Sequence, residues 1–299
     1  MTSKAALITG SSSSSEHDCA PSPQTNLTAK SGDDGARILY FFHMTKTGGR
    51  TIVRHIEQRY GKNAIVHPLK NKTLIHDTFL KKKFRPPQSL GDRHIVGHFA
   101  SFSLLRGREN HYYKACFWRS PATWYLSFYN YRHSRNSKTI KRKIDFAAFC
   151  RSLLPNPMTE RLLLRCADVR GCAYFFMSDK RKFDLACATI ERFDRFDDIA
   201  KVDEFLEFIG HENGQKPKSY NRTPPSEKAL EYIDEPTIAE IERRNPVDFL
   251  LHKIAMGEEI HHVRDQAARV LNRSFDLRDI VPLLLLPYYR YKVWVTPFV

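Results

Sequence analysis

The sequence has no long hydrophobic run. Its longest apolar stretch, residues 280–286, is interrupted by Pro282 and followed by Pro287. A membrane-spanning helix needs about 20 predominantly apolar residues. The N-terminus also lacks an apolar run of the length that a secretory signal peptide requires. We therefore expect no transmembrane segment and a cytoplasmic location.

Cysteine is scarce, and its spacing excludes two classes of site. The six cysteines include no CxxC pair and have no histidine at metal-ligand spacing. This pattern is typical neither of a zinc site nor of a redox pair. Several cysteines lie within apolar segments, so we expect reduced, mostly buried thiols and no metal.

Acidic residues are too few to balance the basic ones. The chain has 48 lysines and arginines against 33 acids, a net charge of +15, and the first 36 residues contribute two lysines against four acids. The remainder therefore carries +17. Such a field attracts nucleotides, sulfated or phosphorylated acceptors, nucleic acid or an anionic membrane, and charge alone does not choose among them. The most basic segments are residues 70–85 and 132–143.

Composition divides the chain into three parts. Residues 1–36 are rich in Ser, Thr, Pro, Gly and Asp and include five consecutive serines, a composition typical of a disordered tail. Residues 37–275 can form one α/β domain. Residues 276–299 are apolar and aromatic, so we expect this extension to pack on the domain or on a second subunit of a homo-oligomer.

Residues 37–51 predict a strand, a tight loop and a helix. The β-branched and aromatic run 38–42 is typical of a buried strand. Gly48 and Gly49 supply backbone freedom for a turn and room for a ligand. From Thr51 apolar residues follow at helical spacing to about Tyr60. A helix that begins at such a turn directs unpaired N–H groups and a positive dipole end at the loop, where Lys46 adds an ammonium.

The loop sequence TKTGGRT, residues 45–51, is not the GxxxxGK[ST] loop of nucleoside-triphosphate hydrolases. It resembles the PKTGGTS-type loop with which sulfotransferases bind the 5′-phosphosulfate of 3′-phosphoadenosine 5′-phosphosulfate (PAPS), and it differs at Thr45 and Arg50. The resemblance implies that Lys46 is catalytic. It also implies a donor-binding set of Lys46, Thr47, Gly48, Gly49, Arg50 and Thr51.

A second motif follows a short strand that ends before Gly97 and His98. The sequence GHFASF, residues 97–102, resembles an element of heparan sulfate 2-O-sulfotransferases and related bacterial enzymes. In those enzymes the histidine is the proposed catalytic base, so the resemblance implies this role for His98. A structural role is the alternative, and His94 is the competing histidine.

A third motif follows the strand predicted at 112–118. Arg119 at the strand end and Ser127 in a helix that begins near Pro121 can converge on one anion. They resemble the RDPxxRxxSxY motif that binds the 3′-phosphate in the same family, with Ser120 and Trp124 as departures. Arg222, in the polar loop 221–225, is a further candidate for contact with the nucleotide, although an ordinary surface turn explains that loop equally well.

The rest of the domain is predicted to be helical. Helices broken near 155–157 and near Gly171 fill residues 144–192, and another helix runs from about 202 to a stop at Gly210. Two further helices are predicted at 236–244 and 246–271. Residues 132–143 are predicted to be a loop.

Together the motifs imply a carbohydrate sulfotransferase of the heparan sulfate 2-O type. The implied fold is α/β, a central parallel sheet flanked by helices in a P-loop-like sulfotransferase arrangement. The implied reaction transfers the sulfuryl group of PAPS to a hydroxyl of a glycan acceptor that can be anionic, without metal or nucleic acid. One alternative is a kinase-like phosphoryl transferase, which needs a Mg²⁺-anchoring loop residue and a strand-end aspartate. Another is a basic module that binds RNA or anionic lipid, whose usual marks are missing.

Overall fold

The computed structural model describes residues 38–67, 92–105, 107–135, 145–169, 173–174, 176–210 and 234–271. Several predictions fall outside these residues: the tail 1–36, the basic segment 70–85, Arg222 and the extension 276–299. Of the helices in the described ranges, none has the length and apolar character needed to cross a membrane.

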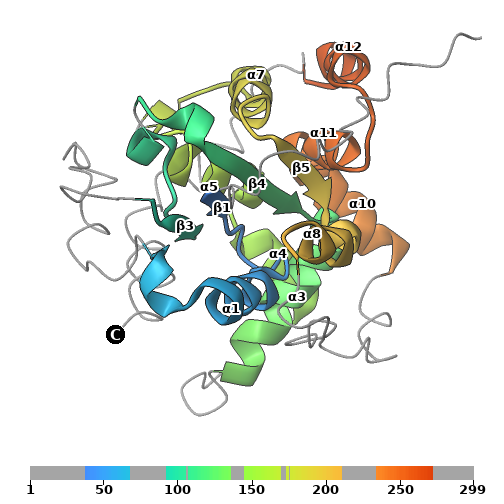
Figure 1. Ribbon diagram of the computed structural model, residues 1–299. Coiled ribbons are helices and arrows are strands. Elements are labelled where there is room, and N and C mark those ends of the chain that lie inside the picture. The colour runs from blue at the N-terminus through green and yellow to red at the C-terminus, as the bar shows by residue number, and fades with distance from the viewer. Residues whose placement is uncertain are drawn as a thin grey trace, which may run out of the picture. The chain divides into compact units, whose positions relative to one another are not determined.

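A five-stranded sheet lies at the centre of the described chain (Figure 1). Its strands are β1 (Ile38–Phe42), β2 (Ile65–Val66), β3 (His94–Gly97), β4 (Tyr112–Trp118) and β5 (Arg195–Asp198). They are all parallel, in the order β2-β3-β1-β4-β5. Parallel neighbours need crossover connections, which place helices on the sheet faces. The predicted central parallel sheet flanked by helices is confirmed.

The side chains of β1 alternate between two apolar clusters. Leu39 and Phe41 belong to a cluster with α1 (Gly49–Tyr60) and α8 (Val202–Phe208), which contact each other. Tyr40 and Phe42 belong to the larger cluster. That cluster contains residues of α3 (Pro121–Arg135), α4 (Phe146–Ser152), α5 (Pro157–Arg165), α7 (Asp179–Ile190), α10 (Glu235–Arg244), α11 (Pro246–Ala255) and α12 (Ile260–Val270).

Short 3₁₀ segments complete the described elements: η1 (Lys62–Ala64), η3 (Phe102–Leu105), η4 (Glu109–His111) and η5 (Ile199–Lys201).

This arrangement sends the connections after β1 and β4 to opposite faces of the sheet. The chain leaves β1 through α1 toward one cluster and leaves β4 through α3 toward the other. Two neighbouring parallel strands whose connections diverge in this way leave a crevice at their carboxyl ends, where ligands bind in open α/β sheets. The loop after β1 and Arg119 after β4 both lie at this edge.

The sequence missed β5, which is an edge strand. Its residues are mostly only partly buried, so its sequence lacks the apolar run of a central strand. Arg195 instead pairs with Asp197 at 2.6 Å across a single intervening residue. The strand therefore contains charged residues that pair with each other, and its sequence does not have the pattern of a buried strand.

Two helix boundaries differ from prediction. The single helix expected at 246–271 is two helices, because the chain turns at Gly257 with φ 103°, a conformation that favours glycine. The helix after Pro121 continues to Arg135, so the expected loop 132–143 is helical over its first four residues. The remainder of that segment lies outside the described residues.

Candidate active site

The loop between β1 and α1 has an unusual backbone. Lys46 and Gly48 both have positive φ, 69° and 72°. For a lysine this conformation costs about 1–2 kcal/mol, and such strain gathers at functional sites. Thr47 is fully buried and donates from its hydroxyl to the Met44 carbonyl at 2.8 Å. Its side chain therefore shapes the loop.

The N-terminus of α1 opens onto this loop. Gly48 is the N-cap and offers no side-chain hydrogen bond, so the N–H groups of Gly49 and Arg50 are left to water or a ligand. The Thr51 N–H donates to the Gly48 carbonyl at 2.9 Å. The helix begins at Gly49, two residues earlier than predicted.

The segment after β4 holds the loop from the opposite side. Arg119 donates from Nη1 to the Lys46 carbonyl at 3.1 Å, and Trp124 donates from Nε1 to the Thr45 carbonyl at 2.7 Å. Two motifs separated by about 70 residues in the sequence thus meet. Trp124, a departure from the resembled motif, has a structural role in fixing the loop.

Lys46 lies among other cations. Its Nζ is 4.6 Å from the centre of the Tyr131 ring. Burial, with Arg119 and Arg50 nearby, lowers the pKa of Lys46 to about 8. An anion bound here would offset this repulsion and raise the lysine's pKa.

Asp198, at the end of β5, supplies negative charge beside Arg119. Burial lowers the pKa of Arg119 while Asp198 opposes that shift. Burial alone would raise the pKa of Asp198, but its hydrogen bonds to His252, at 2.9 Å, and to the Ala200 N–H lower it on balance. The resembled motif has an aspartate directly after the arginine, where this chain has Ser120. The negative charge near Arg119 comes instead from Asp198 of β5. The acid-rich sequence RFDD was the available signal.

Ser127 lies two turns into α3, as predicted, and is partly buried. Within the described residues it is not hydrogen-bonded to Arg119. The structure thus brings together Lys46 and Arg119 of the predicted set and places Ser127 on the neighbouring helix.

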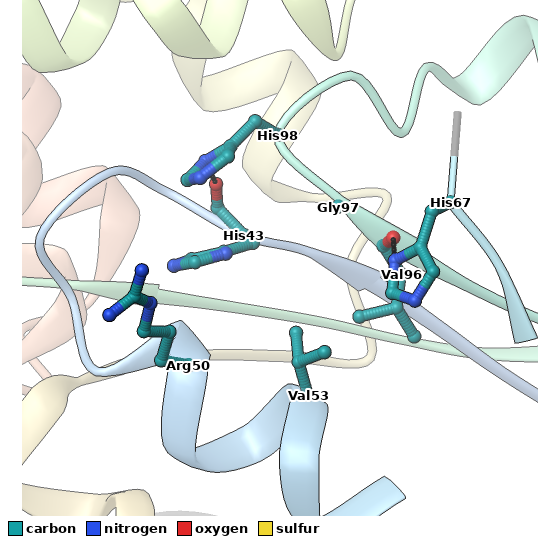
Figure 2. Close-up of a pocket in the computed structure, with 7 residues that line it drawn as sticks. All are labelled: His43, Arg50, Val53, His67, Val96, Gly97 and His98. Atoms are coloured by element: carbon teal, nitrogen blue, oxygen red, sulfur yellow. Dashed lines mark hydrogen bonds between the residues drawn. The ribbon is translucent and has the colours of Figure 1, made fainter. Parts of the chain in front are cut away.

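A pocket lies on the other side of β1, toward β3 (Figure 2). Its volume is about 210 Å³, and it is lined by His43, Arg50, Val53, His67, Val96, Gly97 and His98. Arg50 and Val53 come from α1, and the Arg50 guanidinium points toward His43 (Figure 2). The side chain of Arg50, which the resemblance assigned to the donor, therefore lines this pocket.

His98 has a defined tautomer in the pocket. Its Nδ1 lies 2.6 Å from the His43 carbonyl oxygen. Because a carbonyl only accepts, Nδ1 carries the proton and Nε2 keeps a lone pair. Burial, with Arg165 and Arg161 nearby, lowers the pKa of His98 to about 4. A free imidazole has a pKa of about 6.5, whereas the His98 imidazole is neutral throughout the physiological range.

Comparison with known proteins gives this chain no family. No family model, curated protein or solved structure matches it. The roles of its residues therefore rest on the geometry of the site and on the resemblance of its motifs.

His94 has a structural environment. Its Nδ1 accepts the Leu39 N–H at 3.0 Å, and its ring lies 4.1 Å from that of Tyr60. It begins β3, whereas His98 follows the end of that strand. His94 thus lies at the amino-terminal end of β3, away from the carboxyl ends where the candidate site lies, and its hydrogen bond links β3 to β1.

Sequence reasoning missed His43. Its ring stacks on that of His98, with centroids 3.9 Å apart and planes inclined by 24°. Burial, followed by the effects of His98, Arg50 and Lys46, holds the pKa of His43 well below its usual value. The signal was its position, directly between the predicted strand and the glycine loop.

The four cysteines in the described ranges, Cys116, Cys150, Cys166 and Cys187, are free and buried, as predicted. Burial raises the pKa of Cys150 and of Cys187 to about 12. These thiols therefore remain protonated and form part of the core.

Proposed function

We propose that the protein is a sulfotransferase with a P-loop-like sulfotransferase fold, which moves the sulfuryl group of PAPS to a carbohydrate hydroxyl. The observation that carries the proposal is the hydrogen bond from Arg119 to the Lys46 carbonyl. It joins the two segments that resemble the 5′-phosphosulfate and 3′-phosphate motifs at one ligand-binding edge. Each motif is weak alone, and their meeting in space is independent support.

In this proposal the donor occupies the crevice between β1 and β4. Lys46 and the N–H groups at the start of α1 hold the leaving phosphate, where charge grows during transfer. The Thr51 hydroxyl adds a donor. Arg119 and Ser127 bind the 3′-phosphate and so orient the sulfur.

The acceptor hydroxyl enters the pocket beside His98. Its oxygen attacks sulfur, the bond between sulfur and the phosphate oxygen breaks, and adenosine 3′,5′-bisphosphate leaves. The acceptor proton passes to Nε2 of His98, the nitrogen that carries the lone pair. Arg50 gives the pocket a positive charge suited to an anionic glycan.

A kinase-like phosphoryl transferase is a second candidate, because Asp198 is a strand-end aspartate next to Arg119. Its carboxylate, however, already binds His252 and the Ala200 N–H. The Thr47 hydroxyl is buried against the Met44 carbonyl. These contacts leave a Mg²⁺ ion poorly provided with ligands.

A thermal-shift titration separates the candidates. Adenosine 3′,5′-bisphosphate should raise the melting temperature of the wild type, and the Arg119→Ala variant should respond less. Stabilisation by ATP with Mg²⁺ alone would favour the kinase. Stabilisation only by RNA or anionic vesicles would favour a binding module and overturn the proposal.

A further inference from the structure

His43 is joined to the segment around His98 by three contacts. Its N–H donates to the Gly97 carbonyl at 3.0 Å, and its carbonyl accepts from Nδ1 of His98 at 2.6 Å. Its imidazole then stacks on the His98 ring (Figure 2). His43 therefore contacts the His98 ring at its edge, through the backbone carbonyl, and on its face, through the imidazole.

The His43 ring also lies against Gly49. A Cβ added at Gly49 would lie 1.8 Å from Cδ2 and 2.0 Å from Nε2 of His43. Gly49 has ordinary helical geometry, so backbone freedom does not explain this glycine. Gly48 differs, because its φ of 72° is itself the constraint. The second glycine of the loop, Gly49, is needed because any side chain there would overlap the His43 ring.

We propose that His43 is a positioning residue for the base: its ring, wedged between Gly49 at the start of α1 and His98, fixes the His98 imidazole so that Nε2 faces the acceptor. This inference rests on the proposed function for its kinetic part only. It adds a role for a residue between the donor loop and the acceptor pocket, and it explains why the loop needs two glycines.

The charges around the two rings give the arrangement a measurable signature. His98 faces Arg161 and Arg165 of α5, and His43 faces Lys46 of the loop and Arg50 of α1. The His43 ring also excludes water from one face of His98. Removing that ring should hydrate His98 and move its pKa up from about 4 toward the value of a free imidazole.

The first experiment is a double-mutant cycle in thermal stability. Gly49→Ala should lower the melting temperature in the wild type and cost much less in a His43→Ala background, because the ring it collides with is gone. Gly48→Ala is the matched control. Its cost comes from the backbone, so it should be the same in both backgrounds. Equal costs of Gly49→Ala in the two backgrounds would overturn the packing relationship.

The second experiment follows the His98 ring directly. NMR titration of the imidazole signals, with His98→Gln as the assignment control, should give a higher pKa for His98 in His43→Ala than in the wild type. In turnover with PAPS, His43→Ala should lower kcat roughly 10²-fold, the cost of misplacing a reacting group by about 1 Å, and leave the KM for PAPS unchanged. In the pH profile of kcat, the acid limb of His43→Ala should lie at higher pH than that of the wild type.

The two proposals fail in different ways. A wild type that neither binds adenosine 3′,5′-bisphosphate nor transfers sulfate ends the proposed function, while the cycle and the titration still test the placement of His98. An unchanged His98 pKa in His43→Ala would overturn the inference. An unchanged kcat in an active enzyme would also overturn it.

Discussion

Nη1 of Arg119 lies 3.1 Å from the carbonyl oxygen of Lys46. Arg119 therefore has two functions in the proposed site, since one part of its guanidinium holds the loop and the rest can bind an anion. Lys46 has a left-handed backbone conformation. The hydrogen bond from Arg119 and the one from Trp124 to the Thr45 carbonyl hold the loop in this conformation. Replacing Arg119 and replacing Lys46 should therefore have different effects on nucleotide binding and turnover.

Arg119→Ala should mainly weaken nucleotide binding. The proposal places Arg119 on the 3′-phosphate, which does not react. Hydrogen bonds to charged groups contribute about 1.5–3 kcal/mol, so calorimetry with adenosine 3′,5′-bisphosphate should show a loss of affinity of roughly 10- to 100-fold. Arg119→Lys is the control, because it keeps the charge and loses the fork. Unchanged affinity in Arg119→Ala would refute the assignment of the 3′-phosphate site.

Lys46→Ala should mainly lower kcat, because its interaction strengthens as the leaving phosphate gains charge. Steady-state kinetics with PAPS measure this. A variant that raises only the KM for PAPS would show that Lys46 binds the ground state and transition state equally.

The affinity for adenosine 3′,5′-bisphosphate should fall as pH rises through about 8. The pKa of free Lys46 is lowered to about 8, so the ammonium is present below that pH and lost above it. Because only the ammonium form attracts the phosphate, the affinity should fall as pH rises. Calorimetry between pH 6.5 and 9.5 checks this, and Lys46→Ala should show a flatter dependence. Equal slopes in the two proteins would contradict a lowered lysine pKa.

His98→Ala and His94→Ala should lose different properties. Removing a general base costs on the order of 10²- to 10⁴-fold in turnover, and His98→Ala should retain nucleotide affinity. His94→Ala should instead lower the melting temperature, because the buried Leu39 N–H loses its acceptor. Full turnover in His98→Ala, or a loss explained by unfolding, would remove His98 from the mechanism.

Asp248 on α11 anchors the start of α5. Its carboxylate accepts the Met158 and Thr159 N–H groups at 3.0 and 2.7 Å and the Thr159 hydroxyl at 2.5 Å. Asp248→Ala leaves these donors unpaired, at about 1–3 kcal/mol for each buried group. Urea unfolding should show this loss, while Asp265→Ala on α12 should change stability little.

Asp248 also predicts a pH dependence. Burial raises its pKa to about 6, so the folded state binds the proton more tightly than the unfolded chain. Its contribution is complete below about pH 4 and is lost as pH rises through about 6. In the free energy of unfolding, Asp248→Asn should lack this decline between pH 4 and 6. Parallel curves for wild type and variant would contradict the raised pKa.

The elements that the sequence predicted are those with local signals. β1 and β4 are short apolar runs, and α1 follows a glycine turn with apolar residues at helical spacing. The carboxyl-edge position of Lys46, His98 and Arg119 follows from each motif coming directly after a strand. The three residues were singled out because their motifs resemble those of sulfotransferases, and the strand before each motif is what the sequence could place.

The parts that were missed depend on contacts between distant segments. β5 is stabilised by pairing with β4 and by its own ion pair, and its sequence lacks an apolar pattern. The pKa of His98 is lowered first by burial and then by Arg165 and Arg161 of α5, more than 60 residues away. The relation of His43 to Gly49 exists only once the loop folds back on the strand end. Burial and distant charges of this kind leave no local pattern.

In the proposed function, the crevice between β1 and β4 binds the PAPS nucleotide. Isothermal calorimetry of the wild-type protein with adenosine 3′,5′-bisphosphate, with and without Mg²⁺, tests it most directly. We expect saturable 1:1 binding that does not require Mg²⁺ and is weakened in Arg119→Ala. A folded wild-type protein that binds ATP with Mg²⁺ and not adenosine 3′,5′-bisphosphate would contradict it.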